Sequence, residues 1–183
     1  MGEGRMIVGV SGWIGSGKDA AVRRLVAKRG FTQLNMAAPL KAEVLRIMPR
    51  TVSEILRLNR WPLPQDPTQM RLAVYDEKPP GIRELLQEWG TDLRRAEDPD
   101  YWVRQWKATV QPHRDVCASD VRFQNEAMAI KDLGGVVLRI TRPGTIPGDH
   151  VSERAIDAWP FDAVIQNDGT IEDLWDKIDT LTT

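Results

Sequence analysis

A glycine-rich stretch near the start of the chain, residues 12–19, has the residue types and spacing to bind phosphate. It joins an apolar run at residues 6–10 to a helical pattern at residues 20–28. Glycines let successive N–H groups face one concavity, and the helix N-terminus and a lysine add positive charge there. The pattern predicts a P-loop, formed by Gly12, Trp13, Ile14, Gly15, Ser16, Gly17, Lys18 and Asp19.

Two carboxylates are placed to hold a metal ion beside that loop. Asp19 occupies the position where a P-loop normally carries the Ser or Thr that binds magnesium. Asp120 ends the apolar run 116–119, and the carboxyl ends of strands line the ligand crevice in doubly wound folds. Because carboxylate oxygens suit Mg²⁺, we predict magnesium at Asp19 and Asp120. Two alternatives stay open: a strand–helix turn that binds nothing, and an N-cap role for Asp120.

Residues 82–95 predict an amphipathic helix with an arginine-bearing polar face. At 100° per residue, the apolar face comprises Leu85, Leu86, Trp89 and Leu93. The opposite face comprises Arg83, Gln87, Gly90 and Arg94. A guanidinium binds two oxygens of a phosphate with its planar fork. This face is therefore either an anion-binding surface or an ordinary solvated face.

The elements that must position these groups alternate between strands and helices. Strands are predicted at residues 6–10, 31–35, 116–120, 136–141 and 163–166. Helices are predicted at residues 20–28, 39–48, 51–59, 82–95, 100–110, 152–158 and 171–181. This alternation is typical of the α/β class, with a parallel five-stranded sheet and helices on both faces. Without repeats or boundary signals, residues 1–183 are expected to form a single domain of the P-loop NTPase fold.

Two segments rich in proline or glycine interrupt this alternation. Residues 61–81 contain Pro62, Pro64, Pro67, Pro79 and Pro80. They are expected to be irregular, either a flap that covers a substrate or a plain surface loop. Residues 142–154 are expected to form a mobile lid that closes over phosphates and carries Arg142.

Composition excludes several classes of protein. The net charge of −1 gives no broad electrostatic case for nucleic-acid or membrane binding. A single cysteine, Cys117, excludes an internal disulfide framework. No apolar stretch is long enough to span a bilayer, so we expect a cytoplasmic enzyme.

Several stretches, in order along most of the chain, resemble the deoxynucleoside monophosphate kinases of bacteriophages, which are P-loop enzymes of the nucleoside-monophosphate-kinase fold. The stretches are residues 16–19, 83–87, 90–92 with Arg95, 101–103, 120–126 and 150–153. Gln124 departs from the family pattern, which has proline there. Residues 164–170 and their helix also resemble dephospho-coenzyme A kinase, and the Gly-Lys-Asp ending of the P-loop is similar to animal phosphomevalonate kinase.

The resemblance implies ATP-dependent phosphorylation of a deoxynucleoside 5′-monophosphate to the diphosphate, with ATP and Mg²⁺ as cofactors. The catalytic residues it implies are Lys18, Asp120, Arg122 and Arg142. The acceptor-binding residues it implies are Arg83, Gln87, Gly90, Thr91, Arg95, His150 and Glu153. Asn167 would lie near the adenine. The acceptor-binding helical region would span about residues 37–110, and the lid-like segment about residues 142–154.

The expected partners are small-molecule nucleotides, with no nucleic acid and no membrane, and a homodimer is left open. If a phage encodes the chain, it would act in the host cytoplasm. The rival functions are another small-molecule P-loop kinase, acting on dephospho-coenzyme A or phosphomevalonate, and proteins of another class. A nucleotide-binding switch lacks support because the chain has no Asn-Lys-x-Asp guanine motif. Near-zero net charge and short length argue against a DNA-dependent ATPase.

Overall fold

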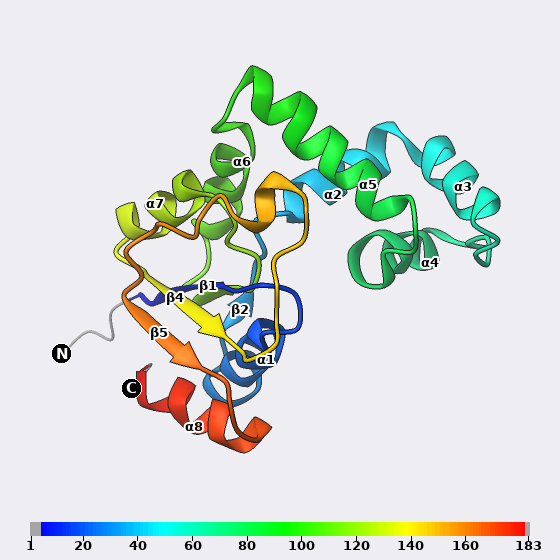
Figure 1. Ribbon diagram of the computed structural model, residues 1–183. Coiled ribbons are helices and arrows are strands. Elements are labelled where there is room, and N and C mark those ends of the chain that lie inside the picture. Colours follow the sequence, from blue (N-terminus) through cyan, green and yellow to red (C-terminus); the bar gives the residue numbers. More distant parts are fainter. Residues whose placement is uncertain (1–4, 182–183) are drawn as a thin grey trace. The chain divides into compact units, whose positions relative to one another are not determined.

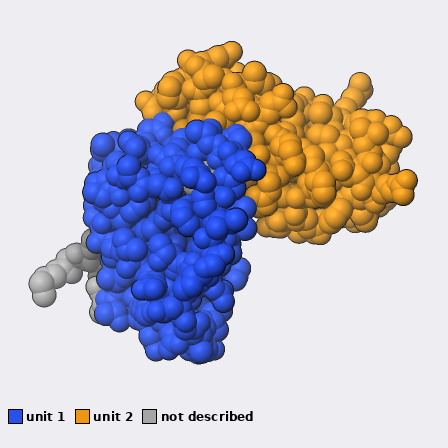
Figure 2. Space-filling view, viewed as in Figure 1, with its two compact units in different colours: residues 1–36, 106–183 blue, residues 37–105 orange. Residues whose placement is uncertain are grey.

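The computed structural model describes residues 5–181, apart from the side chain of Glu153, and divides into two compact units. Unit 1 comprises Met1–Met36 and Trp106–Thr183, and unit 2 comprises Ala37–Gln105. Figure 1 traces the chain, and Figure 2 colours the units separately. The two ends of the predicted 1–183 domain lie outside the described residues. No helix within residues 5–181 is long and apolar enough to cross a membrane.

Unit 1 is built on a five-stranded parallel sheet, as the sequence predicts. Its strands are β1 (Ile7–Ser11), β2 (Thr32–Gln33), β3 (Val116–Ala118), β4 (Val136–Thr141) and β5 (Ala163–Gln166). They lie in the order β2-β3-β1-β4-β5. The central strand β1 pairs with β3 and β4, so the residues that follow it emerge from the middle of the sheet. Strand β2 is shorter than the predicted 31–35.

Helices cover both faces of this sheet. Successive side chains of β1 point to opposite faces and therefore pack against different helices. Val8 and Val10 pack with α1 (Lys18–Arg29) and α8 (Ile171–Leu181) in one buried cluster. On the opposite face, Gly9 lies so close to α7 (Gln124–Asp132) that a Cβ there would overlap the side chain of Ile130. This arrangement, seen in Figure 1, confirms the predicted α/β class with helices on both faces.

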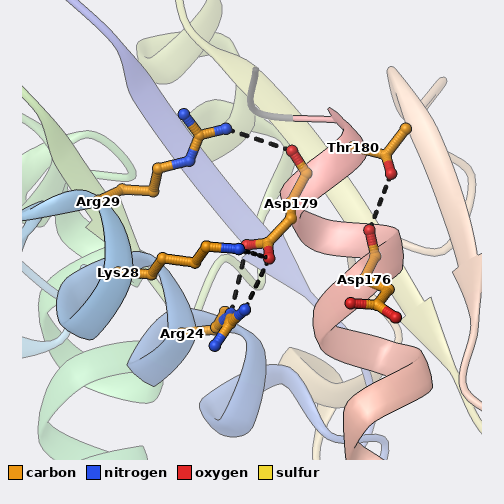
Figure 3. Close-up of polar contacts among 6 residues, drawn as sticks. All are labelled: Arg24, Lys28, Arg29, Asp176, Asp179 and Thr180. Atoms are coloured by element: carbon orange, nitrogen blue, oxygen red, sulfur yellow. Dashed lines mark hydrogen bonds and ion pairs between the residues drawn. The ribbon is translucent and has the colours of Figure 1, made fainter.

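An ion-pair cluster fastens α1 to α8 (Figure 3). The carboxylate of Asp179 accepts hydrogen bonds from Arg24 Nη2 at 2.8 Å and Lys28 Nζ at 2.5 Å. Arg29 donates to the Asp179 carbonyl oxygen at 3.2 Å. The hydrogen bonds from Arg24 and Lys28 lower the pKa of Asp179 to about 2. The cluster therefore holds the C-terminal helix against the helix that follows the glycine-rich loop.

Unit 2 is helical and has its own buried cluster. Its helices include α2 (Ala38–Ile47), α3 (Pro49–Leu58), α4 (Pro67–Leu72) and α5 (Ile82–Gln87). Two π-helical segments, η1 (Ala73–Glu77) and η2 (Glu88–Arg95), continue α4 and α5. Helix α6 (Tyr101–Val110) begins in unit 2 and ends in unit 1. The core contains Val44, Val52, Leu56, Ala73, Val74, Ile82 and Leu86.

Two prolines of unit 2 begin helices at positions that the sequence analysis did not predict as helix starts. Pro67 opens α4 within the segment predicted to be irregular, and Asp66 Oδ1 accepts from the Thr68 and Gln69 amides at 2.8 and 2.9 Å. Pro49 opens α3, so the expected start at residue 51 was wrong. Both follow from the fixed φ of proline, which suits the first helical position.

The helix over residues 82–95 forms, but its predicted faces hold only in its first half. Beyond Gln87 the backbone is π-helical, with more residues per turn than the 100° projection assumes. Leu93, assigned to the apolar face, is therefore 46% exposed. Gly90, assigned to the polar face, is buried, and a Cβ there would lie 2.6 Å from Leu40 Cδ2. The short helix expected at 152–158 is only a 3₁₀ turn, η3 (Val151–Glu153).

Candidate active site

The glycine-rich loop between β1 and α1 is shaped by its backbone. Gly12 and Gly17 have φ values of 155° and 102°, which residues with a Cβ rarely adopt. A Cβ at Gly12 would lie 2.6 Å from the Ile140 carbonyl oxygen, and one at Gly17 would lie 2.5 Å from Asn167 Nδ2. Both glycines are thus required by conformation and by space. The sequence motif and the observed turn agree at these positions.

The N-terminus of α1 opens into this loop and suits an anion. Gly17 is its N-cap, and no side chain caps the helix there. The first-turn amides of a helix are unpaired within the helix and carry partial positive charge. Lys18 is 9% exposed, and its Nζ donates to the Trp13 carbonyl oxygen at 3.4 Å. Main-chain amides and one ammonium group are therefore gathered at the loop, as phosphate binding requires.

Asn167 supports this loop with its side chain. It is 5% exposed, and its Nδ2 donates to the Ser16 carbonyl oxygen at 2.9 Å. Its own backbone amide donates to the Thr141 carbonyl oxygen at 2.8 Å. Asn167 therefore ties the end of β5 to the glycine-rich loop. The adenine contact implied by the resemblance stays a prediction.

Asp120 lies at the end of β3, and it does not cap the following helix. Its Oδ1 accepts from the Met36 amide at 2.7 Å, whereas the N-cap of α7 is Phe123. The alternative N-cap role for Asp120 was therefore wrong. The buried Glu126, which sequence reasoning missed, accepts from the amides of Arg122 and Phe123 at 2.7 and 3.1 Å. Its signal was a glutamate at the third helical position, as in a capping box.

Asp19 and Asp120 offer the carboxylate oxygens that magnesium prefers as ligands. Asp19 is exposed in the first turn of α1, and Asp120 lies at the carboxyl end of β3. Across residues 5–181 there is no group of three or more His, Cys, Asp or Glu side chains that could enclose a metal by themselves. Magnesium commonly uses one or two carboxylates together with phosphate oxygens and water. The donor set therefore suits Mg²⁺ bound with phosphates.

The lid-like segment begins with a turn that lies against the glycine-rich loop. The Arg142 carbonyl oxygen accepts from Thr145 N at 3.2 Å and Thr145 Oγ1 at 2.7 Å. The Thr145 methyl group would be 3.7 Å from a Cβ on Gly15. Further along, His150 Nδ1 lies 2.8 Å from Ser152 Oγ, at the start of η3. The side chain of Glu153 lies outside the described part of the chain.

In unit 2 the predicted acceptor residues occupy the helix formed by α5 and η2. Arg83 is exposed, and no side chain in the described part of the chain pairs with it. Gln87 and Thr91 are half-buried. Arg95 Nη1 donates to the Pro99 carbonyl oxygen at 3.2 Å. The Gly90 carbonyl oxygen accepts from Trp102 Nε1 at 2.9 Å, which identifies Gly90 as a packing position.

A network around Glu43 holds η2 to α2, and sequence reasoning missed it. Glu43 accepts from Tyr101 Oη at 2.7 Å, Trp89 Nε1 at 3.0 Å and Arg94 Nη2 at 3.0 Å. The Arg94 guanidinium also faces the Trp89 and Tyr101 rings at 4.9 and 5.2 Å. Burial alone would raise the pKa of Glu43, but these hydrogen bonds outweigh it and the pKa is lowered. The Arg94 side chain is thus part of the network that holds η2 to α2.

Comparison with known proteins gives findings at three levels. The sequence model of the deoxynucleotide monophosphate kinase family matches residues 65–178. A homologue of that description from Acanthamoeba polyphaga mimivirus is 33% identical, covering 94% of this chain and 94% of its own. The deoxynucleotide monophosphate kinase of Enterobacteria phage T4 is 32% identical, covering 53% of this chain and 43% of its own. A dephospho-CoA kinase structure from Campylobacter jejuni covers 96% of this chain and 95% of its own, with a TM-score of 0.50 and 12% identity, a likeness of fold alone.

Proposed function

The chain belongs to the deoxynucleotide monophosphate kinase family, and on this premise we propose how its residues move a phosphoryl group from ATP to a deoxynucleoside 5′-monophosphate. The products are ADP and the deoxynucleoside diphosphate. The observation that carries the proposal is the loop between β1 and α1, where Lys18 lies over a helix N-terminus without a side-chain cap. Triphosphate oxygens are the anions that such a loop binds.

The loop and Lys18 hold the β- and γ-phosphates of ATP. The ammonium of Lys18 donates to the Trp13 carbonyl oxygen at 3.4 Å and, because an ammonium has three N–H donors, it can also form a charge-assisted bond to phosphate. The amides of the loop and of the first turn of α1 bind the remaining oxygens. Asn167 keeps the loop in shape through Ser16, and we propose that its neighbourhood also meets the adenine.

Asp19 and Asp120 are the residues that hold magnesium. With these two carboxylates as its protein ligands, a bound magnesium ion would supply positive charge to the phosphates. Asp19 lies in the first turn of α1, where its own charge would otherwise repel the phosphates. Asp120 keeps one oxygen on the Met36 amide, and this bond orients the carboxylate.

The acceptor monophosphate binds to the helix formed by α5 and η2. Arg83 is exposed, and its planar guanidinium can bind two oxygens of the doubly charged monophosphate. Arg95 adds a second guanidinium, with one nitrogen already fixed by Pro99. Gln87 and Thr91 supply neutral hydrogen bonds to phosphate or base. Gly90 acts indirectly, because its packing against Leu40 and Trp102 sets the path of the helix.

Charge that develops during the transfer is neutralised by arginines, and water is kept out by the lid-like segment. Arg142 is exposed at the start of that segment, and Arg122 follows Asp120 in the loop after β3. Phosphoryl transfer depends on positioning and electrostatic stabilisation rather than on covalent help from the protein. Closure of residues 142–154 would bring Arg142 to the phosphates and keep water out, which would prevent hydrolysis of ATP. The acceptor-binding roles of His150 and Glu153 stay predictions.

An acceptor panel in a coupled assay of ADP release tests the proposal. ATP and Mg²⁺ are held constant while each deoxynucleoside monophosphate, dephospho-coenzyme A or phosphomevalonate is added. We expect turnover with one or more deoxynucleoside monophosphates and none with the other two acceptors. Turnover only with dephospho-coenzyme A or phosphomevalonate, or only on addition of DNA, would overturn the assignment of the acceptor.

A further inference from the structure

A buried arginine outside the predicted site connects the glycine-rich loop to the segment that follows the lid. Arg139 lies in β4, opposite Ser11 in the parallel register, and is 8% exposed. Its Nη1 donates to Ser11 Oγ at 3.2 Å, and its Nη2 donates to Asp157 Oδ1 at 2.7 Å. Its guanidinium faces the Trp13 ring at 5.4 Å and the Phe161 ring at 5.5 Å. Every one of these contacts is within unit 1.

The contacts of Arg139 lead directly to the lysine of the loop. Trp13 packs its ring on Arg139, and its carbonyl oxygen accepts from Lys18 Nζ. The same carbonyl oxygen accepts from the Ser16 amide at 3.1 Å. A shift of Trp13 would therefore displace both the lysine charge and the turn that presents the loop amides. Arg139 therefore contacts the ring of Trp13 from β4 of the sheet.

The other end of this network is the chain that returns from the lid-like segment. Asp157 follows residues 142–154 and is half-exposed, so solvent reaches one side of the pair. Phe161 follows it and leads into β5. A buried guanidinium is costly unless it is paired and hydrogen-bonded, and Asp157 supplies the charge that makes the site of Arg139 tenable. Movement of the return segment would thus change the support of Trp13.

We propose that Arg139 is a positioning residue for ATP binding, which holds Trp13 and Lys18 in place and, through Asp157, ties the loop to the base of the lid. The inference rests on the proposed kinase function, because it assigns Lys18 to the phosphates. Its basis is the placement of one guanidinium between Ser11, Trp13 and Asp157. No direct contact of Arg139 with ATP is invoked.

Titration of ATP onto the full chain without acceptor tests the inference in a set of variants. Arg139→Met should weaken ATP binding by about tenfold, a coupling typical of residues in one network. Asp157→Asn should weaken it less, because the hydrogen bond to Arg139 survives without the charge. Arg139→Lys should recover part of the loss, since the charge returns without the planar fork. In steady-state assays the KM for ATP should rise while the KM for the acceptor stays constant.

The pair Lys131–Asp162 offers a matched control in the same unit. Lys131 Nζ lies 2.5 Å from Asp162 Oδ1, and neither residue is joined to the glycine-rich loop by these contacts. Lys131→Met should lower the melting temperature without changing ATP affinity. The double variant Arg139→Met with Asp157→Asn should bind ATP no more weakly than Arg139→Met alone, because both act through one connection.

The inference would be overturned if Arg139→Met and Asp157→Asn bound ATP as tightly as wild type. In that case these variants would lose only stability, as the Lys131→Met control does. If Arg139→Met does not fold, the Asp157→Asn variant decides alone, because Asp157 is half-exposed and the change is conservative. An ATP affinity equal to that of wild type would then overturn the inference. A failure of the proposed function has a different signature. The wild type would then bind ATP, with the variant pattern intact, but would turn over no deoxynucleoside monophosphate.

Discussion

The two units of the chain build their candidate sites from different parts of the polypeptide. In unit 1 the phosphate-binding loop depends on backbone geometry, with positive φ at Gly12 and Gly17 and a helix N-terminus without a side-chain cap. In unit 2 the helix that carries Arg83 depends on side chains, because η2 is held to α2 through Glu43. A backbone site is encoded within a few consecutive residues, whereas a side-chain network needs partners far apart in the sequence.

The separation of those partners explains why the glycine-rich loop was visible in the sequence and the Glu43 network of unit 2 was not. Trp89 and Tyr101 lie 46 and 58 positions from Glu43, and no local pattern connects them. Mutations in the loop should therefore abolish chemistry with little effect on the fold. Mutations in the helical unit should mix acceptor binding with stability, and the experiments below test this contrast.

The largest effect is expected from Lys18→Ala. Removing the ammonium deprives the phosphates of charge as the transition state forms, so kcat should fall by about 10²–10³-fold, the range for one preorganised electrostatic group. The melting temperature should change little, because the side chain serves the ligand. Lys28→Ala, at the other end of α1, is the control and should keep near wild-type kcat. A well-folded Lys18→Ala protein with near wild-type turnover would contradict the P-loop assignment.

Asp19 should act through magnesium rather than through ATP directly. In Asp19→Ala, the Mg²⁺ concentration for half-maximal rate should rise by about tenfold or more, as for loss of a group that orients a metal. Asp19→Ser should recover part of the loss, because a hydroxyl is the usual ligand at this position. The measurement is the rate as a function of free Mg²⁺ at saturating ATP. An unchanged magnesium dependence in both variants would leave Asp19 as a helix-dipole partner in the first turn.

Arg83→Ala and Arg95→Ala should weaken the acceptor selectively. Each loss should cost about 1.5–3 kcal/mol, the worth of a hydrogen bond to a charged group, which is roughly tenfold or more in the acceptor KM. The KM for ATP should barely move, and lysine should rescue only partly. Arg57→Ala is the control, because Arg57 is an exposed arginine of the same unit paired with Glu54. Equal small changes in both Michaelis constants would move the acceptor site elsewhere, first to residues 61–81.

Sequence patterns predicted the elements whose signals are local. The bounds of β4, β5 and α8 agree with those expected, because alternation, apolar runs and turn residues define them. The faces of residues 82–95 could not be obtained this way, since a switch to π-helical pitch depends on packing that the projection ignores. Likewise, nothing near Asn167 in the sequence indicates that its amide holds Ser16, 151 positions away.

The prolines of unit 2 also show where interpretation of the sequence failed. A run of prolines was interpreted as irregular chain, yet Pro67 begins a helix because Asp66 precedes it as an N-cap. Asp followed by Pro is a signal for the start of a helix, and it was overlooked because the segment was interpreted from its number of prolines. The buried Ala73 and Val74 then draw this segment into the core of the unit.

Glu43→Gln should test the network of unit 2 through stability. The change keeps the shape but removes the charge that faces Arg94, so the free energy of unfolding should fall by about 1–3 kcal/mol, the cost of an impaired buried polar network. Chemical denaturation measures this loss. The matched control is Glu54→Gln on α3, whose pair with Arg57 is more than half exposed on both sides, and surface pairs contribute little. Equal losses in the two variants would show that the Glu43 network is no more important than a surface pair.

The smallest effect is expected at the junction of α1 and α8, where stability rather than catalysis should depend on pH. Hydrogen bonds from Arg24 and Lys28 lower the folded-state pKa of Asp179 from 3.8 to about 2. A carboxyl group with a lowered pKa stabilises the fold at pH values above its unfolded pKa, and that contribution disappears as the pH falls toward the folded pKa. Asp179→Asn should therefore lower the melting temperature modestly at neutral pH, and the difference from wild type should shrink between about pH 4 and pH 2.

The helix α8 lies against α1 through Leu174 and Ile178 as well, so the Asp179→Asn variant should remain folded. Its KM for ATP should equal that of wild type, because Lys18 and Asn167 are held by other contacts. A melting-temperature difference that did not shrink as the pH fell toward 2 would contradict the lowered pKa of Asp179. A raised KM for ATP would show that the ion pairs shape the loop itself, which would remove the contrast between a backbone-defined site and its side-chain supports.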